Sequence, residues 1–251
     1  MIFTPEVLYY FKWSPMKTLL RIVLLMILVA ATSLQAEQNN YCGELYISHR
    51  YGPFDYTNAN HRIEKLSIVE RAHFTPNIRD LISGKSGTVA SEISYTLHAF
   101  PNHHIALQSM SKLGLREKSG QPENAEYSVE CYFDRAFRFQ PKDAVVRMLY
   151  ANYLLKLGGR QAEVLEQYQI AIGLAPENAN INYNIGLVYL KNKSYDQAIE
   201  HAKKAYKMGF PLPGLRNKLM KTGKWDGKLE ETESSEADGS ADEETSVKSQ
   251  E

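Results

Sequence analysis

Histidine is the residue type here that most directly suggests metal binding or proton transfer, because a neutral imidazole binds metals and titrates near neutral pH. The histidines concerned are His61, His73, His98, His103 and His104. Two ligands on one helical face need a spacing of three or four residues, whereas His98 and His103 are five apart with Pro101 between them. We therefore expect no metal. We predict that Asn102 caps a helix beginning at His103, with both adjacent imidazoles on the surface of its first turn.

The segment Gly84-Lys85-Ser86 contains part of a phosphate-binding loop. The complete motif needs a glycine five residues before Gly84, and that position holds Arg79. The motif also needs a strand before it, whereas residues 76–82 have the pattern of a short helix. A turn between helices is the better interpretation, and we expect no nucleotide or other cofactor.

A nucleophilic serine is typically found on a Gly-x-Ser-x-Gly turn, and the sequence contains no such turn. Cys42 and Cys131 lack the neighbours of a cysteine nucleophile and lie in no haem-attachment motif. We therefore assign no catalytic residue. The alternative is an enzyme or metal-binding protein with its site in residues 41–100, which hold histidines and tyrosines.

The composition is that of an ordinary globular protein of one or two domains, with 251 residues, 43% of them hydrophobic and 23% charged. The formal charge is zero, but residues 226–251 contain ten acidic and two basic residues, a net charge of −8. The first 36 residues carry +2, so the stretch between these two segments carries +6. That is well short of the basic face of a nucleic-acid-binding protein, and we expect no nucleic-acid partner.

The first 36 residues have the layout of a secretory signal peptide. From Met16, basic residues at 17 and 21 precede an uninterrupted apolar run over 22–31 and then small residues. The run is shorter than the roughly 20 residues that span a bilayer. We predict cleavage after Ser33 or Ala36 and an exported, periplasmic protein. The alternative is an uncleaved inner-membrane anchor that tethers the chain through residues 17–31.

Export would place both cysteines in an oxidising compartment, where disulfides persist. Cys42 and Cys131 are the only cysteines of the chain, and both lie beyond the two cleavage sites. They are therefore a disulfide candidate. The alternative is that Cys131 is a small buried apolar residue and that Cys42 is a free thiol.

The middle of the chain repeats with a period of 35 residues. Pro141, Pro176 and Pro211 share this spacing, as do Asp143 and Asn178. The same spacing relates Phe133 to Tyr168, Tyr150 to Ile185, Ala151 to Gly186 and Leu154 to Tyr189. A constant period with similar residue types is typical of a helical solenoid, and each period contains two apolar helical faces separated by a break. Asp143 and Asn178 are expected to be helix N-caps.

The sequence over residues 183–189, followed by residues 195–199, resembles the tetratricopeptide repeat (TPR). Residues 144–176 resemble the same repeat with one residue inserted, and residues 127–141 resemble the second helix of a third unit. The resemblance implies an all-α fold, a short TPR-type helical solenoid over residues 101–222. Residues 37–100 would be an irregular N-terminal capping region, with helices over 59–72 and 91–100. A ligand surface built from its tyrosines is the alternative role of that region.

Residues 223–251 are expected to be a disordered acidic tail, because they contain too little apolar surface to bury. In a stack of helix pairs, the first helix of each pair lines a concave surface. The residues expected on it, as the partner-binding face, are Met148, Asn152, Leu155, Lys156, Asn180, Tyr183, Leu187, Leu190 and Lys191.

This mixture of apolar and polar side chains suits an extended peptide or a partner helix. We therefore expect a non-catalytic, exported TPR adaptor or scaffold that binds a protein or peptide partner during assembly of an envelope complex. Two alternatives remain at this point, the enzyme or metal-binding protein described above and a membrane-tethered structural protein.

Overall fold

The computed structural model describes residues 42–229, which form helices and loops without a strand. The predicted all-α class is therefore confirmed for this part of the chain. The chain divides into two compact units, the first ending at Pro176 and the second beginning at Glu177. The signal peptide or anchor predicted over residues 1–36 lies outside the described residues, as does the acidic tail from residue 230 onward.

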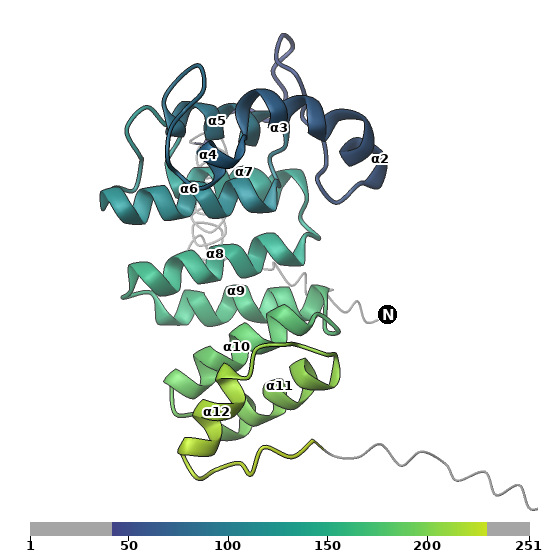
Figure 1. Cartoon of the computed structure of the whole chain (residues 1–251), viewed down its shortest axis with the longest axis vertical. Helices are drawn as coiled ribbons and strands as arrows, with labels where there is room; N and C mark the ends of the chain where they lie inside the picture. Colours follow the sequence, from purple (N-terminus) through teal and green to yellow (C-terminus); the bar gives the residue numbers. More distant parts are fainter. Residues whose placement is uncertain (1–41, 230–251) are drawn as a thin grey trace, which may run out of the picture. The chain divides into compact units, whose positions relative to one another are not determined.

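The first part of unit 1 contains short helices joined by ordered loops (Figure 1). They are α2 (Ala59–His61), a π-helical turn (Arg62–Leu66), α3 (Ser67–His73), α4 (Pro76–Arg79) and α5 (Val89–Ala99). The helices predicted over 59–72, 76–82 and 91–100 are therefore present. Pro76 begins α4, where its missing N–H costs nothing because the first turn leaves that group unpaired.

The second part of unit 1 is a series of longer helices, α6 (His104–Glu117), α7 (Val129–Phe139), α8 (Ala144–Leu157) and α9 (Gln161–Leu174). α6 contacts α7 and α8, α7 contacts α8, and α8 runs alongside α9 (Figure 1). Helical repeats pack in this way, each against its neighbours along the chain.

The 35-residue period marks positions of the core. Phe133 and its counterpart Tyr168 are fully buried, as are Ala136 and Ala171 one helical turn further on. The two predicted N-caps are also present. The Asp143 carboxylate accepts from the backbone N–H groups of Val145 and Val146, and the Asn178 side chain caps α10 in the same way.

Unit 2 consists of α10 (Ala179–Lys191), α11 (Tyr195–Lys207) and α12 (Gly214–Lys221). Its core contains Ala198, Ala202, Leu215, Leu219 and Trp225. Gly186 shows why small residues recur here, because a Cβ at this position would lie 2.6 Å from Leu215 Cδ2. The absence of a side chain at Gly186 therefore lets α10 lie close to α11 and α12.

The region predicted to cap the longer helices, residues 37–100, contacts them through α4 and α5, which pack directly against α6. Its capping role stays a prediction, whereas the structure corrects the start of the tail. The tail does not begin at residue 223, because Trp225 is only 8% exposed and packs in the core of unit 2, with Leu229 against it. Trp225 and Leu229 have lysines and glycines as neighbours and show no helical periodicity, so the sequence around them does not indicate this apolar contact.

The cysteine pair forms a disulfide. The two Sγ atoms are 2.06 Å apart, the Cα atoms are 5.0 Å apart, and both residues are buried. The bond closes a long stretch of chain, since 89 positions separate Cys42 from Cys131. It attaches the beginning of the described chain to α7.

Replacing both cysteines by alanine is expected to lower the free energy of unfolding by about 3–5 kcal/mol, because the crosslink restricts the unfolded chain over a long loop. The measurement is urea unfolding of the oxidised protein and of the double variant, without reductant. Intact mass identifies the oxidised state. Two free thiols in protein purified without reductant, or equal unfolding midpoints, would contradict the assignment.

Candidate functional site

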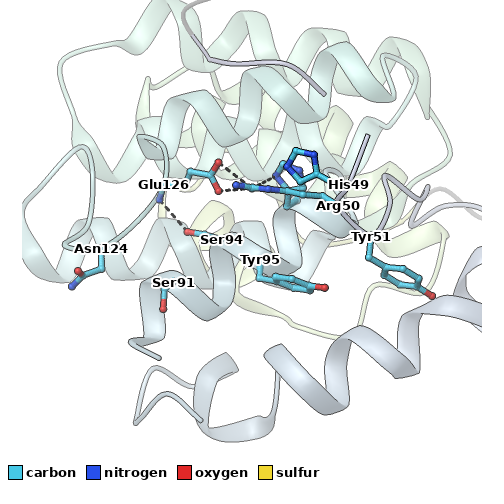
Figure 2. A pocket seen from close by; sticks show the side chains of 9 residues that line it. His49, Arg50, Tyr51, Ser91, Ser94, Tyr95, Asn124 and Glu126 are labelled. Carbon is cyan, nitrogen blue, oxygen red and sulfur yellow. Dashed lines mark hydrogen bonds and ion pairs between the residues drawn. The ribbon is translucent and has the colours of Figure 1, made fainter. Parts of the chain in front are cut away.

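A pocket of about 430 Å³ lies in unit 1 between the segment before α2, one face of α5 and the loop that precedes α7. Its volume is within the range of small-ligand pockets in proteins. Figure 2 shows the side chains that line it, which are His49, Arg50, Tyr51, Ser91, Ser94, Tyr95, His98, Asn124 and Glu126. Three chain segments that are far apart in sequence therefore contribute to one hollow.

The segment that carries Arg50 is attached to α7 by more than the disulfide. Arg135, 1% exposed, donates from Nη1 to the carbonyl oxygens of Cys42 (3.0 Å) and Glu44 (2.8 Å). Arg138 donates to the carbonyl of Gly43 at 3.0 Å. Nη1 of Arg135 is therefore paired, whereas its Nη2 is buried without a hydrogen-bond partner and the guanidinium lies over the Tyr127 ring. The carbonyls that accept from Arg135 and Arg138 fix the path of the chain.

The other end of this segment is fixed against the end of α5. The Phe54 N–H donates to the Ala99 carbonyl at 2.8 Å. Gly52 has a φ of +105°, and a Cβ on it would lie 2.6 Å from the Ala99 oxygen, so only glycine fits this approach. Tyr51 is thereby held at the edge of the pocket.

Arg50 is the centre of the polar contacts in the pocket. Its Nη1 donates to the two carboxylate oxygens of Glu126 at 2.9 and 3.1 Å and to Nδ1 of His98 at 3.0 Å. Figure 2 shows the Arg50 guanidinium and the Glu126 carboxylate directed toward each other. A guanidinium only donates, so His98 Nδ1 accepts and the imidazole carries its proton on Nε2.

His98 is therefore a neutral donor. Burial, together with the positive charges of Arg50 and Arg135, lowers the pKa of His98 to about 4. At neutral pH the imidazole therefore carries no charge and keeps its proton on Nε2.

The two serines of the pocket are already engaged. Ser94 Oγ donates to the Ala90 carbonyl at 2.7 Å and accepts from Tyr132 Oη at 2.6 Å. Ser91 Oγ donates to the Thr88 carbonyl at 3.0 Å. Neither hydroxyl is paired with an imidazole, so the described residues of this pocket contain no serine activated by a base.

Two half-exposed tyrosines provide the aromatic surface, with Tyr51 at 38% and Tyr95 at 42% exposure. The Tyr95 ring stacks on His73, with ring centroids 3.8 Å apart. His73 Nδ1 is in turn 2.7 Å from a carboxylate oxygen of Glu92. This chain of contacts positions Tyr95 from the interior of unit 1.

Glu92 explains the segment that resembles a phosphate-binding loop. Its Oε1 accepts from Ser86 N (2.7 Å), Ser86 Oγ (2.8 Å) and Gly87 N (3.0 Å), and the side chain is only 3% exposed. Burial raises its pKa, but the hydrogen bonds from Ser86 and His73 outweigh burial and lower the pKa to about 2. The loop binds a carboxylate of its own chain, and the predicted turn between helices is confirmed.

The prediction for Asn102 and the two histidines after it is wrong. His103 is itself the N-cap of α6, accepting from Ala106 N at Nδ1, and it is fully buried. Burial is the largest cause of its lowered pKa. Asn102 cannot cap the helix because its side chain bonds elsewhere, accepting from Tyr56 N and donating to two carboxylates.

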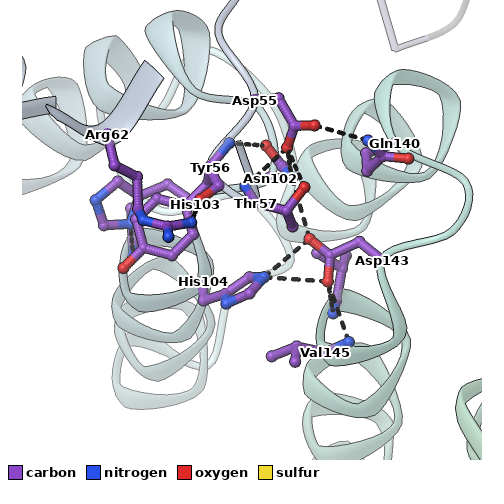
Figure 3. Close-up of polar contacts among 12 residues, drawn as sticks. Asp55, Tyr56, Thr57, Arg62, Asn102, His103, His104, Gln140, Asp143 and Val145 are labelled. Carbon is purple, nitrogen blue, oxygen red and sulfur yellow. Dashed lines mark hydrogen bonds and ion pairs between the residues drawn. The ribbon is translucent and has the colours of Figure 1, made fainter. Parts of the chain in front are cut away.

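Those two carboxylates belong to Asp55 and Asp143, and they join the N-terminal segment to the longer helices (Figure 3). Asp55 also accepts from Gln140 at 2.7 Å, and Asp143 lies 2.8 Å from His104 Nε2. Every polar group named here has a partner, which is typical of a structural network. Among residues 42–229, no group of three or more His, Cys, Asp or Glu side chains could hold a metal ion.

The residues predicted for the partner-binding face are divided between the two units. Met148, Asn152, Leu155 and Lys156 belong to α8 of unit 1; Asn180, Tyr183, Leu187, Leu190 and Lys191 belong to α10 of unit 2. Met148 is buried, and three of the α10 side chains pack on the core of unit 2; these are Tyr183, Leu187 and Leu190. Lys156, Asn180 and Lys191 are exposed. A common binding face for all nine residues stays a prediction.

Sequence reasoning missed Arg50 and Glu126, which are 76 residues apart and belong to no local motif. Tyr51 and Tyr95 were included only in the alternative of a tyrosine surface. The candidate disulfide is the one sequence feature that indicates this contact, because it brings residues near 42 close to residues near 131.

Comparisons with known proteins add no family. No model of a known protein family matches the chain, and no curated protein matches it in sequence. The resemblance to TPR proteins therefore depends on the residues and the helix packing described above, and it stays a prediction.

The pKa of His98 predicts how stability depends on pH. The folded value is about 4 and the ordinary value is 6.5, so below pH 6.5 the unfolded chain binds a proton that the folded chain does not. The free energy of unfolding should therefore fall as the pH drops from 6.5 toward 4. His98→Asn, which keeps an acceptor for Arg50, should reduce this dependence when urea midpoints at pH 7 and pH 5 are compared.

Some dependence should remain in the variant, because the pKa values of His103 and His201 are also lowered, in both cases mainly by burial. Glu92 does not interfere, since its stabilisation is complete above pH 4.5 and is lost only as the pH falls toward 2. An unchanged dependence in His98→Asn would show that His98 is not the group concerned.

Tyr183 offers a test of the predicted partner-binding face. Its ring stacks on Phe210 with centroids 4.0 Å apart, and it also contacts the Tyr206 ring. Tyr183→Ala is expected to lower the free energy of unfolding by about 2–4 kcal/mol, as removal of packed aromatic rings does. Tyr46→Ala, at a site 73% exposed, is the control and should have little effect. Unchanged stability of Tyr183→Ala would instead favour a binding role.

Proposed function

We propose that this protein is a non-catalytic, exported adaptor or scaffold of TPR type, which binds a protein or peptide partner during assembly of an envelope complex. The observation that supports this most is the pocket around Arg50. Tyrosine and arginine are over-represented among binding hot spots. Here two tyrosines and an arginine line one pocket, together with the buried polar residues Ser94 and His98.

The chemistry of the pocket favours binding over catalysis. The hydroxyls of Ser91 and Ser94 are hydrogen bonded to backbone carbonyls, and the His98 Nδ1 lone pair is taken by Arg50. General-base catalysis needs an imidazole with an available nitrogen near a hydroxyl or a water. The contacts of these residues suit the recognition of polar groups instead.

Export is supported by the disulfide, because such bonds persist in oxidising compartments and are rare in the cytosol. No helix within residues 42–229 has the length and apolar character needed to cross a membrane. The TPR assignment is supported by the 35-residue period and by the buried residues that recur with it.

The proposal predicts that the pocket contacts the partner in the cell. A photo-reactive phenylalanine placed at Tyr95 should crosslink to a discrete protein of the cell envelope, identified by mass spectrometry. The same group at Ile63, an exposed apolar position on the π-helical turn, is the matched control and should not. A third position, Lys191, tests the face predicted from sequence.

Crosslinking from position 191 without crosslinking from position 95 would place the partner on α10 and contradict the pocket assignment. Crosslinking from neither position, or recovery of the protein only from the cytosol, would contradict the adaptor function itself.

A further inference from the structure

One edge of the Arg50 guanidinium is unused. All of its hydrogen bonds to His98 and Glu126 are made by Nη1, and Nε and Nη2 have no acceptor among residues 42–229. The side chain lies in the pocket wall and is exposed. Nε and Nη2 present parallel N–H donors in a fixed plane, the geometry that matches the two oxygens of a carboxylate.

We propose that the pocket recognises a carboxylate of a peptide ligand, which the Nε and Nη2 edge of Arg50 binds through two hydrogen bonds. This inference rests on the proposed function, in which the pocket is the partner-binding site. The residues concerned lie outside the helices that resemble TPR units, so the site does not depend on that resemblance.

The other polar groups of the pocket agree with an anionic ligand. His98 lines the pocket as a neutral imidazole and adds no charge, and Asn124 lines it with a neutral amide. The charged acceptor of the pocket, Glu126, already binds Arg50 with both oxygens. A cationic ligand would have to displace Arg50 from Glu126, whereas a carboxylate can bind the free edge without breaking that pair.

The aromatic residues indicate what accompanies the carboxylate. The Tyr51 ring packs on Phe54 and the Tyr95 ring stacks on His73, and both tyrosines are partly exposed. Their exposed faces can therefore pack against an apolar or aromatic side chain of the ligand. A volume of about 430 Å³ holds a short chain end with its last side chains and not a folded domain. The carboxylate can come from a peptide C-terminus or from an Asp or Glu side chain.

The test uses three pools of fluorescein-labelled random hexapeptides and the mature, disulfide-bonded chain. The first pool has free C-termini and no Asp or Glu, the second is the same pool amidated, and the third is amidated with one fixed Glu. Fluorescence anisotropy measures binding. Preference for the first pool over the second identifies a terminal carboxylate, and preference for the third identifies a side-chain carboxylate.

Two variants of the pocket have opposite expected effects. Arg50→Lys keeps the charge but loses the planar pair of donors, so affinity should fall by about tenfold or more. Glu126→Gln removes a negative charge beside the ligand, so affinity should rise by roughly threefold or more. Arg71→Lys, on the exposed surface of α3, is the control and should bind like the unmodified protein. Melting temperatures confirm that each variant is folded.

Equal binding of the amidated and free-acid pools, no effect of Arg50→Lys, or weaker binding by Glu126→Gln would overturn the carboxylate assignment. If no pool binds although position 95 crosslinks to a partner in cells, the carboxylate assignment fails while the proposed function stands. If position 95 also fails to crosslink, the proposed function falls as well.

Discussion

The attachment of the first described residues to α7 is the constraint on which the candidate site depends. The disulfide between Cys42 and Cys131 and the buried Arg135 hold the chain at the same place, one covalently and one through backbone carbonyls. Arg50 follows a few residues later, so its position in the pocket is set by this attachment. A segment without regular structure can thus present a fixed arginine, which is what pre-organised binding requires.

A second set of contacts fixes the same segment from the other side. Asp55 and Asp143 share Asn102, and through it the loop before α2 is joined to the first turns of α6 and α8. These buried polar groups bond one another closely, and removal of one would leave others unpaired at considerable cost. Arg50 and Tyr51 lie along the chain between these two attachments, which together hold this part of the pocket wall in place.

The sequence allowed prediction of the features that depend on local rules. Period and residue type located the buried Phe133 and Tyr168 and the caps Asp143 and Asn178, because helix packing and capping act over a few residues. Features that depend on distant partners were not predictable. Arg50 meets Glu126 only because of the fold, and His103 is buried against the rings of Tyr56 and Phe74, which come from segments distant in sequence. The sequence of the loop at Ser86 resembles part of a phosphate-binding loop, but its backbone N–H groups donate to the carboxylate of Glu92. That contact is not evident from the sequence of the loop itself.

Attachment to α7 holds the pocket together, and amide hydrogen exchange before and after reduction of the disulfide measures this dependence. Reduction should speed exchange over residues 44–56 and at the end of α5, where Phe54 and Ala99 are hydrogen bonded, and should leave α10 and α11 unchanged. No change in the first segment would contradict it, and so would a uniform increase over both units.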